Sequence, residues 1–294
     1  MKVAVVCGGN SSEREISIIT GNAVYNGLLK NFEAECIVCD NARDCLDKII
    51  KSSPSVVFIA LHGGFGENGQ LQAALESLGI KHTGCSFAES NIAMNKFATK
   101  AILKKLSIPT AEFKLIKKVE EIENIDFYPI CIKPNNEGSS VDVNFANNEN
   151  QAKYISQNLL KKHNELIIEK RLSGKELTVG VLFGKALPII EIRPKSGFYD
   201  YKNKYTKGAT DYIVPAPLEN NIEKLIKDIA VKAFEAIGCK SYARIDFILD
   251  GNVPYLLEIN TIPGMTPTSL LPKAAKAAGI SFEELTKMIV EGAC

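Results

Sequence analysis

The stretch YARIDFILDGNVPYLLEIN, residues 242–260, contains two runs of alternating apolar and polar side chains around the turn sequence DGN at 250–252. This pattern predicts a β-hairpin. If the hairpin is centred on Asn252, Asp246 lies directly opposite Glu258. Two facing carboxylates repel each other unless a cation lies between them. The hairpin therefore predicts a cation site on one face of a sheet.

The same register predicts a third oxygen ligand, because it places Arg244 opposite Asn260. Asp246, Glu258 and the Asn260 amide oxygen form a set of hard oxygen donors. Such a set suits Mg²⁺, which takes a few protein ligands and leaves its other positions to phosphates. The alternative is a solvated hairpin face on which Arg244 neutralises the two acids.

The loop after the hairpin, TIPGMTPTSL at 261–270, favours a binding site over a solvated face. Backbone N–H groups near Gly264 could face an oxyanion. The loop leads into a helix whose first turn contains Ser269 and Leu270, and a helix N-terminus attracts negative charge.

Upstream, ICIKPNNEGSSVDV at 130–143 predicts a strand that ends at Lys133, followed by a flexible turn, EGSS, at 137–140. The turn offers several backbone donors and two hydroxyls, so it could fold over phosphates. An ordinary hairpin turn is the alternative.

The segment ELIIEKRLSGKELTV at 165–179 predicts a strand, a glycine turn and a second strand. Lys170 beside Glu169, with Leu172 and Glu176 after it, could line a pocket for adenine and ribose. The alternative is a surface edge with salt bridges.

Apolar runs alternate with helical periodicity over the first 80 residues, which predicts a parallel α/β layer. A longer amphipathic helix is expected over 86–106. Beyond it we expect a small, mainly antiparallel sheet with a helix near 149–162. A third region begins near 175 with two strands, a long irregular stretch at 195–216 and a helix at 219–237, and it ends in two helices. The last helix begins with the capping-box pattern Ser281 and Glu284.

The composition is that of a globular protein, and we expect its partner to be a small molecule. Over 294 residues, hydrophobic side chains make up 46% and charged ones 23%, with a formal net charge of +1. That balance excludes a disordered chain and gives no support to a nucleic-acid partner or a membrane surface. No apolar run approaches the roughly 20 residues of a membrane helix. Because Met1 leads directly into a strand-like run, we expect a cytoplasmic protein.

The eight cysteines are scattered along the chain, which fits reduced thiols better than a disulfide framework. Cys36 and Cys39 have C-x-x-C spacing, but they fall in a predicted strand. Residues three apart in a strand point to opposite faces, so these thiols are not expected to bind one ion together.

Two glycine-rich segments resemble parts of nucleotide sites. AVVCGGNSSEREISIITG at 4–21 predicts a strand, a glycine loop and a helix start, in which Ser12 and Glu15 match a capping box. The segment Gly64–Gly69 is a literal G-x-G-x-x-G, but the acidic residue at the required distance, Glu89, falls in a predicted helix rather than at a strand end. We therefore favour a tight glycine turn that lets His62 approach a ligand over a site for NAD.

The motifs together resemble the D-alanine:D-alanine ligase family of the ATP-grasp superfamily, over essentially the whole chain. In chain order they are GGNSSEREIS, ALHGGFGENGQLQ, MNKFATK, Lys133 with EGSS, EKRLSGKELTV, FYDYKNKY, ARIDFIL and LLEINTIPGMTPTSL. The resemblance implies an α/β protein with a parallel N-terminal domain (1–95) and two α+β domains (96–178 and 179–294) that sandwich ATP. It also implies a homodimer and a role in peptidoglycan precursor synthesis.

The resemblance implies a role for each matching residue. For ATP binding the residues are Lys96, Lys133, Glu169, Lys170, Leu172 and Glu176. Two Mg²⁺ ions, or Mn²⁺ in their place, would be held by Asp246, Glu258 and Asn260. The substrates would be bound by Glu15, His62, Lys204, Ser269 and Leu270. The catalytic residues would be Glu15, Ser139, Tyr205, Arg244 and Gly264.

In this scheme Glu15 takes the ammonium of the first D-alanine, so it would be more than a helix cap. Arg244 and the Gly264 N–H form the oxyanion site, and Lys204 and Ser269 hold the second carboxylate. The loop FYDYKNKYTKG is a lid that brings Tyr205 toward Ser139 and Glu15. Ser139 and Tyr205 are candidates for taking the proton from the second amine.

Three alternatives remain open. The first is a D-alanine:D-lactate or D-alanine:D-serine ligase on the same scaffold, although the Lys204-Tyr205 pair resembles dipeptide-forming members. The second is a non-catalytic nucleotide-binding module, and the third is the NAD enzyme. Two positions depart from the family pattern. Asp142 stands where a glycine is expected, which predicts a stiffer or more acidic phosphate turn, and Lys175 stands where a neutral residue is common.

Overall fold

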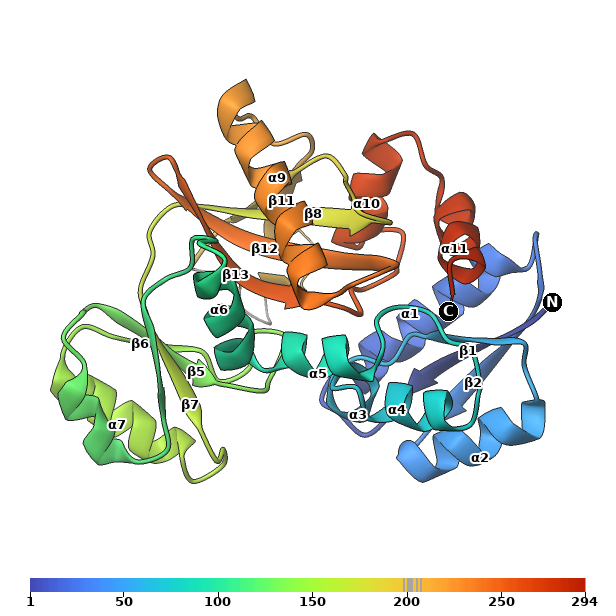
Figure 1. Ribbon diagram of the computed structural model, residues 1–294, viewed down its shortest axis with the longest axis horizontal. Coiled ribbons are helices and arrows are strands. Elements are labelled where there is room, and N and C mark those ends of the chain that lie inside the picture. The colour runs from blue at the N-terminus through green and yellow to red at the C-terminus, as the bar shows by residue number, and fades with distance from the viewer. Residues whose placement is uncertain (198, 200–202, 205, 207, 294) are drawn as a thin grey trace.

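The computed structural model describes residues 1–197, 199, 203, 204, 206 and 208–293. Three sheets follow one another along the chain (Figure 1). The first is parallel, with strand order β2-β1-β3, and confirms the predicted α/β layer. Its strands are β1 (Lys2–Gly8), β2 (Glu33–Cys39) and β3 (Val56–Ile59). Its helices are α1 (Arg14–Leu28), α2 (Ala42–Ser52), α3 (Gly64–Glu67) and α4 (Gln70–Ser77).

The parallel sheet is apolar on both faces, as a layer between helices must be. Val3, Val5 and Cys7 of β1 pack with α1 in one core cluster, while Ala4 and Val6 pack with α2 and α4 in another. Cys36 and Cys39 also belong to these two different clusters. The prediction that their thiols point to opposite faces is confirmed.

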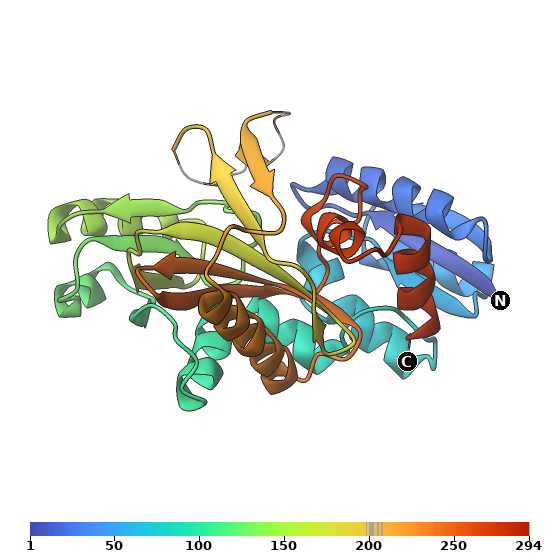
Figure 2. The same ribbon diagram turned by 90° about the horizontal axis from the view of Figure 1, so that it is seen from above.

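The second sheet is antiparallel, as predicted, with strand order β4-β7-β5-β6. Its elements are β4 (Phe113–Ile116), the 3-10 helix η1 (Val119–Asn124), β5 (Ile130–Pro134), β6 (Asn144–Ala146), α7 (Glu149–Leu159) and β7 (Leu166–Lys170). Helix α7 and η1 pack together over one face, and they enclose a separate small core. This part of the chain stands apart at one end of the molecule in Figures 1 and 2.

The third sheet is the largest, with order β11-β10-β8-β12-β13, and β9 adds to β8. Its strands are β8 (Lys175–Leu182), β9 (Lys185–Ala186), β10 (Ile190–Pro194), β11 (Thr210–Ile213), β12 (Tyr242–Asp250) and β13 (Val253–Asn260). The later helices are α9 (Asn220–Ile237), α10 (Leu270–Ala277) and α11 (Phe282–Glu291). The predicted cap of the last helix is confirmed, because Ser281 Oγ accepts from the Glu284 N–H at 3.1 Å.

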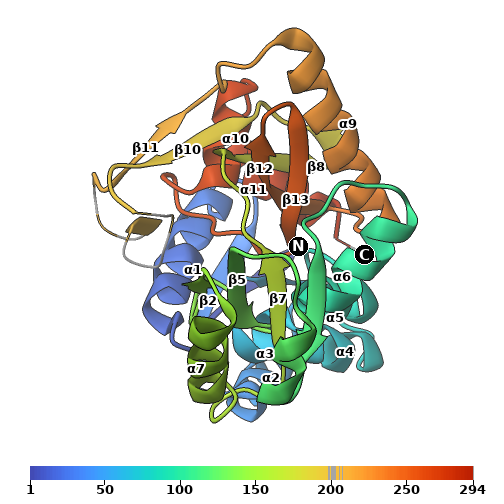
Figure 3. The same ribbon diagram turned by 90° about the vertical axis from the view of Figure 1, so that its left-hand side faces the viewer.

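Helix α9 covers one face of the large sheet, and strands β10 and β11 project from its edge (Figures 2 and 3). The alternate residues Ile245, Phe247 and Leu249 of β12 pack under α9. Arg244 and Asp246 therefore point to the opposite face. That face of the third sheet is directed toward the second sheet and the N-terminal layer.

Three expectations about elements are corrected. The segment 86–106 is two helices, α5 (Phe87–Met94) and α6 (Lys96–Lys105), because Asn95 leaves the helical conformation and its side chain caps α6 by accepting from the Ala98 N–H. The stretch 195–216 is not wholly irregular, since it contains β11. The expected division at 178 and 179 falls inside β8, whose pairing with β12 already begins at Lys175.

Within the described residues, no helix combines the length and the apolar character that crossing a membrane requires.

Candidate active site

The predicted register of the hairpin is confirmed, with Asp246 opposite Glu258 and Arg244 opposite Asn260. The reason is a β-bulge. Near the turn the pairing is centred between Gly251 and Asn252, since Asp250 pairs with Val253, and Leu257 is an extra residue between the partners of Asp246 and Phe247. Without the bulge, alternation would turn Glu258 toward the core that contains Leu256.

Asp246 is held on the open face by two neighbours. Arg244 Nε and Nη2 donate to its two carboxylate oxygens at 2.9 and 2.7 Å, and Thr178 Oγ1 of β8 donates to Oδ1 at 2.6 Å. The Oδ2 atom keeps a lone pair for a further partner, because a carboxylate offers about four acceptor sites. Arg244 therefore orients this carboxylate without occupying all of its acceptor capacity.

A cavity of about 500 Å³, here called the sheet pocket, lies between the second and third sheets. Its volume is that of a small-molecule site. All six residues predicted to bind ATP line it, together with Asp246 and Glu258. The six are Lys96, Lys133, Glu169, Lys170, Leu172 and Glu176.

Glu169 lies at the buried end of the sheet pocket between two lysines. Its Oε1 atom is 3.0 Å from Lys133 Nζ and 3.4 Å from Lys100 Nζ. Burial raises the pKa of Glu169, but the two lysines lower it by more, so the pKa lies below its usual range. Lys100, which is fully buried and also donates to Thr110 Oγ1 at 2.7 Å, is a residue that the sequence analysis did not identify. The feature of the sequence that could have indicated Lys100 is the position of a lysine on the core side of an amphipathic helix.

The pKa values of two other carboxylates in the sheet pocket are shifted in opposite directions. Burial raises the pKa of Glu176 to about 8, and the negative charge of Asp246 adds to this effect. Burial also raises the pKa of Glu258, but Lys96, Lys204 and other cations outweigh it and lower the pKa to about 2. Glu258 is therefore ionised at neutral pH, as a ligand for a cation must be, whereas Glu176 tends to hold its proton.

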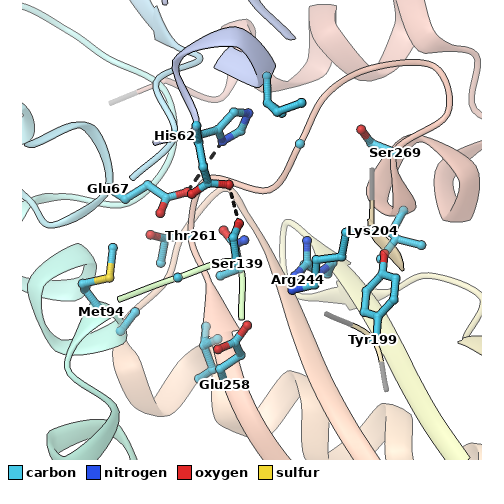
Figure 4. A pocket seen from close by; sticks show the side chains of 18 of the residues that line it. His62, Glu67, Met94, Ser139, Tyr199, Lys204, Arg244, Glu258, Thr261 and Ser269 are labelled. Carbon is cyan, nitrogen blue, oxygen red and sulfur yellow. Dashed lines mark hydrogen bonds and ion pairs between the residues drawn. The ribbon is translucent and has the colours of Figure 1, made fainter. Parts of the chain in front are cut away.

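A second cavity of about 320 Å³, here called the junction pocket, lies where the N-terminal layer meets the third sheet. Figure 4 shows His62, Glu67 and Ser139 facing Arg244, Glu258 and Ser269 around it. Lys96, Lys204 and Glu258 line both cavities. The two pockets therefore meet at a carboxylate and two lysines.

Glu15 does not reach either pocket, which corrects the prediction for this residue. It is exposed, whereas Glu13 is 7% exposed, lines the junction pocket and accepts a short hydrogen bond from Ser139 Oγ. Residues two apart in a helix turn lie on different faces, so only one of the two can face the cavity. The capping box is also wrong, because α1 begins at Arg14 with Glu13 at the N-cap position.

His62 lines the junction pocket as predicted, and it contacts Glu67, which was not predicted as a site residue. Its Nε2 atom is 2.9 Å from Thr20 Oγ1, and its Nδ1 atom is 3.6 Å from Glu67 Oε1. Burial raises the pKa of Glu67, and the negative charge of Glu13 adds to this effect, against the lowering by His62. Glu67 belongs to the GFGENG segment, so the segment supplies a side chain to the pocket.

In the GFGENG segment, Gly66 serves packing. A Cβ atom on Gly66 would lie 2.3 Å from the Leu61 Cβ, so a larger residue does not fit. Glu89, the acidic residue that a dinucleotide site would need at a strand end, lies in α5. The segment therefore lacks the structural context of an NAD site.

The loop after the hairpin reaches the junction pocket as predicted. Gly264, Ser269 and Leu270 all line it, and Ser269 is the N-cap residue of α10. The Ser269 hydroxyl accepts from the Thr266 N–H at 3.1 Å, which closes the loop into the helix. A hydroxyl and a helix N-terminus together suit a carboxylate.

The long loop contributes Lys204, whose Nζ lies 5.1 Å from the centre of the Tyr199 ring. Both residues line both pockets. Tyr199 was not identified from the sequence, although it belongs to the FYDYKNKY motif. The predicted contacts of Tyr205 lie outside the described residues.

The residues present fit a divalent cation bound together with phosphates. Asp246 and Glu258 are partners on one face, and the Asn260 amide oxygen, which accepts from the Ile262 N–H at 2.9 Å, keeps a second lone pair. Within the described part of the chain, no cluster of three His, Cys, Asp or Glu residues could hold a metal by itself. The site thus needs oxygens from a ligand to complete a coordination shell, as Mg²⁺ sites with phosphates do.

Two sheets that enclose a pocket lined by lysines and by paired carboxylates define the ATP-grasp class of enzymes. The chain belongs to the D-alanine–D-alanine ligase family. The family model for the D-ala D-ala ligase C-terminus matches residues 94–291.

Individual relatives agree over the full length. The chain is 43% identical to a D-alanine–D-alanine ligase of Syntrophotalea carbinolica, over 99% of this chain and 96% of the relative. A crystal structure of D-alanine–D-alanine ligase from Bacillus anthracis complexed with ATP superimposes with a TM-score of 0.88 at 34% identity, covering 99% of this chain and 96% of that one. The VanG D-Ala:D-Ser ligase of Enterococcus faecalis gives 0.85 at 26% identity, covering 99% and 98%.

Proposed function

We propose that this protein joins two D-alanines to D-alanyl-D-alanine at the expense of ATP, for the synthesis of peptidoglycan precursors. The observation that carries the proposal is the meeting of the sheet pocket and the junction pocket at Lys96, Lys204 and Glu258. This arrangement lets an amino-acid carboxylate in one pocket meet the γ-phosphate of a nucleotide in the other.

ATP is proposed to lie in the sheet pocket with its base at the buried end. Glu169 Oε1 is buried and ion-paired with Lys133 and Lys100, but among the described residues it accepts no hydrogen bond of good geometry. An adenine amino group would supply that bond. Lys170 and Leu172 would complete the base site, and Glu176 would contact the ribose. Lys96 and Lys133 would neutralise phosphate charge.

The first step is phosphoryl transfer to the first D-alanine. One oxygen of its carboxylate attacks the γ-phosphorus, the bond to the β-γ bridging oxygen breaks, and ADP leaves. Glu13 would hold the ammonium group of this D-alanine, with His62 and Glu67 behind it. Asp246, Glu258 and Asn260 would hold Mg²⁺ or Mn²⁺, which supplies charge neutralisation on the phosphates.

The second step forms the peptide bond. The amine of the second D-alanine attacks the acyl carbon, and phosphate leaves from the tetrahedral intermediate. Arg244 and the Gly264 N–H, which both line the junction pocket, would stabilise the developing oxyanion, and Ser269 with Lys204 would hold the second carboxylate. Ser139, already hydrogen-bonded to Glu13, would pass a proton toward that carboxylate.

A second candidate is ligation of D-alanine to D-serine or D-lactate, because a D-Ala:D-Ser ligase shares this fold. D-Lactate lacks the ammonium group that D-alanine and D-serine both carry. The acidic residues Glu13 and Glu67 of the junction pocket favour zwitterionic substrates, which places D-lactate last, and the match to D-alanine–D-alanine ligases places D-alanine before D-serine.

The location and assembly are proposals of the same kind. A cytoplasmic enzyme fits a reaction that consumes ATP, and the seven described cysteines are all free thiols, as expected in a reducing compartment. A homodimer is expected from the family resemblance. Light scattering at enzyme concentrations used for assays would show whether the mass is that of one chain or two.

ADP formation measured with D-alanine, L-alanine or no amino acid tests the main proposal. We expect turnover that requires D-alanine and Mg²⁺. A second series adds D-serine or D-lactate to D-alanine and identifies the products by mass spectrometry. Absence of D-alanyl-D-alanine in both series would refute the proposal, whereas a depsipeptide or mixed dipeptide as the main product would select the second candidate.

A further inference from the structure

The turn Glu137–Asp142, here called the serine turn, adopts a backbone that its side chains disfavour. Ser139, Ser140 and Asp142 have φ angles of 51°, 59° and 54°. Left-handed φ angles are unfavourable for residues other than glycine, although Asp tolerates them better than most. Three such residues within four positions persist only if surrounding contacts hold them.

This backbone sends two consecutive hydroxyls to different pockets. Ser139 lines the junction pocket and donates to Glu13 of the N-terminal layer. Ser140 lines the sheet pocket and donates to the Tyr199 carbonyl of the long loop at 3.0 Å. The conformation of the serine turn therefore determines contacts in both pockets at once.

His163 fixes the far end of the serine turn. Its Nε2 atom donates to Asp142 Oδ2 at 2.8 Å, with the two side chains 17% and 30% exposed. The backbone of His163 is anchored in turn, because its N–H donates to the Leu159 carbonyl at the end of α7 at 2.9 Å. The Asp142 carbonyl accepts from Asn144 Nδ2 at 2.9 Å. Neither His163 nor Asp142 lines either pocket.

We propose that the His163–Asp142 pair is a positioning device that holds the serine turn closed over the nucleotide. The inference rests on the proposed function, because it assigns the phosphates of ATP to the sheet pocket. A hydrogen bond between a histidine in the segment just after α7 and a left-handed aspartate ties the turn to the second sheet, so that closing it over phosphates costs less ordering entropy. The alternative is that Asp142 serves only to tolerate the backbone conformation.

Five variants of the full chain separate these two roles. His163→Leu and Asp142→Gly each break the hydrogen bond, and the glycine also relieves the left-handed backbone. His163→Gln keeps an N–H donor and Asp142→Asn keeps an oxygen acceptor, so they are the matched controls. The fifth variant combines His163→Leu with Asp142→Gly. KM for ATP, kcat, ADP affinity by titration calorimetry and the urea midpoint are measured for each.

We expect His163→Leu and Asp142→Gly each to raise the KM for ATP and weaken ADP binding about fivefold, the effect of losing one hydrogen bond. The controls should stay within about twofold, and the double variant should be no worse than either single one. Unchanged nucleotide affinity in both single variants, or effects that multiply in the double variant, would overturn the proposal. If His163→Leu does not fold, Asp142→Gly decides by itself, since it relieves the backbone. ADP titration tests the pair even if the enzyme proves to use no D-alanine.

Discussion

The carboxylates of Asp246 and Glu258 face each other across β12 and β13 because Leu257 of β13 is an extra, bulged residue between Leu256 and Glu258. The bulge turns Glu258 out of the core and into the two pockets. A sheet that packs under α9 on one face thereby presents two carboxylates on the other. An irregularity in the strand pairing thus places the charge of Glu258 in the site.

Asp246→Asn should leave nucleotide binding nearly intact and lower turnover about 100-fold. The amide keeps the size of the side chain, but it removes one of the two carboxylates proposed to hold Mg²⁺. ADP affinity and D-alanine-dependent ADP formation are the measurements. Asp250→Asn, on the same strand and outside both pockets, is the control. Full turnover of Asp246→Asn would exclude the hairpin as the metal site.

Glu13→Gln should raise the KM for the first D-alanine by about 10-fold to 100-fold and that for ATP by less than threefold. The reason is the loss of a charge-assisted hydrogen bond to an ammonium group. Glu15→Gln, two residues further along, should behave as the wild type because Glu15 is exposed. Initial rates with each substrate varied decide the matter. A larger effect from Glu15 than from Glu13 would reverse the assignment.

Lys100→Met should weaken ATP binding and lower the free energy of unfolding by about 2–3 kcal/mol. The variant removes one of the two cations on buried Glu169, and breaking a buried pair leaves a charge with less compensation. Urea unfolding and ADP titration provide both readouts. Lys105→Met, exposed on the same helix, should change neither. Equal stability of the two variants would mean that Lys133 alone compensates Glu169.

Glu176 should make the protein without nucleotide less stable as the pH rises. Its folded pKa of about 8 lies above the value of 4.5 expected when unfolded, so the unfolded chain releases this proton first. The contribution is therefore fully present below about pH 4.5 and is lost as the pH rises toward 8. In Glu176→Gln, the decline in unfolding free energy between pH 5 and pH 8 should be smaller by roughly 1–3 kcal/mol. Parallel urea-derived pH profiles of the two proteins would contradict this.

The sequence predicted features that depend on near neighbours. Short apolar runs identified the strands of the parallel layer, and alternation identified the hairpin and placed Asp246 opposite Glu258. A turn centred on Asn252 would give this pairing without a bulge, whereas the structure combines a tighter turn with a bulge at Leu257. The tighter turn shifts the pairing by one residue, and the bulge shifts it back by one. The predicted pairing is therefore confirmed, although its cause is a different one.

Other features depended on contacts between distant parts of the chain. Glu13 and Glu15 are equally plausible in a helix pattern, and only Ser139, 126 residues away in the sequence, distinguishes them. The same holds for buried Lys100 against Glu169 and for His163 against Asp142. Periodicity reports which side of an element is apolar, and it carries no information about which polar group from another element meets it.

By itself the sequence determined the order of the elements, the family and a set of site residues of which nearly all line the two pockets, because short motifs and strand alternation are local properties. Only the tertiary structure decided which acid reaches the junction pocket and what holds the serine turn. Those outcomes follow from burial, which makes a charged or strained group stable only beside a partner that the fold brings to it.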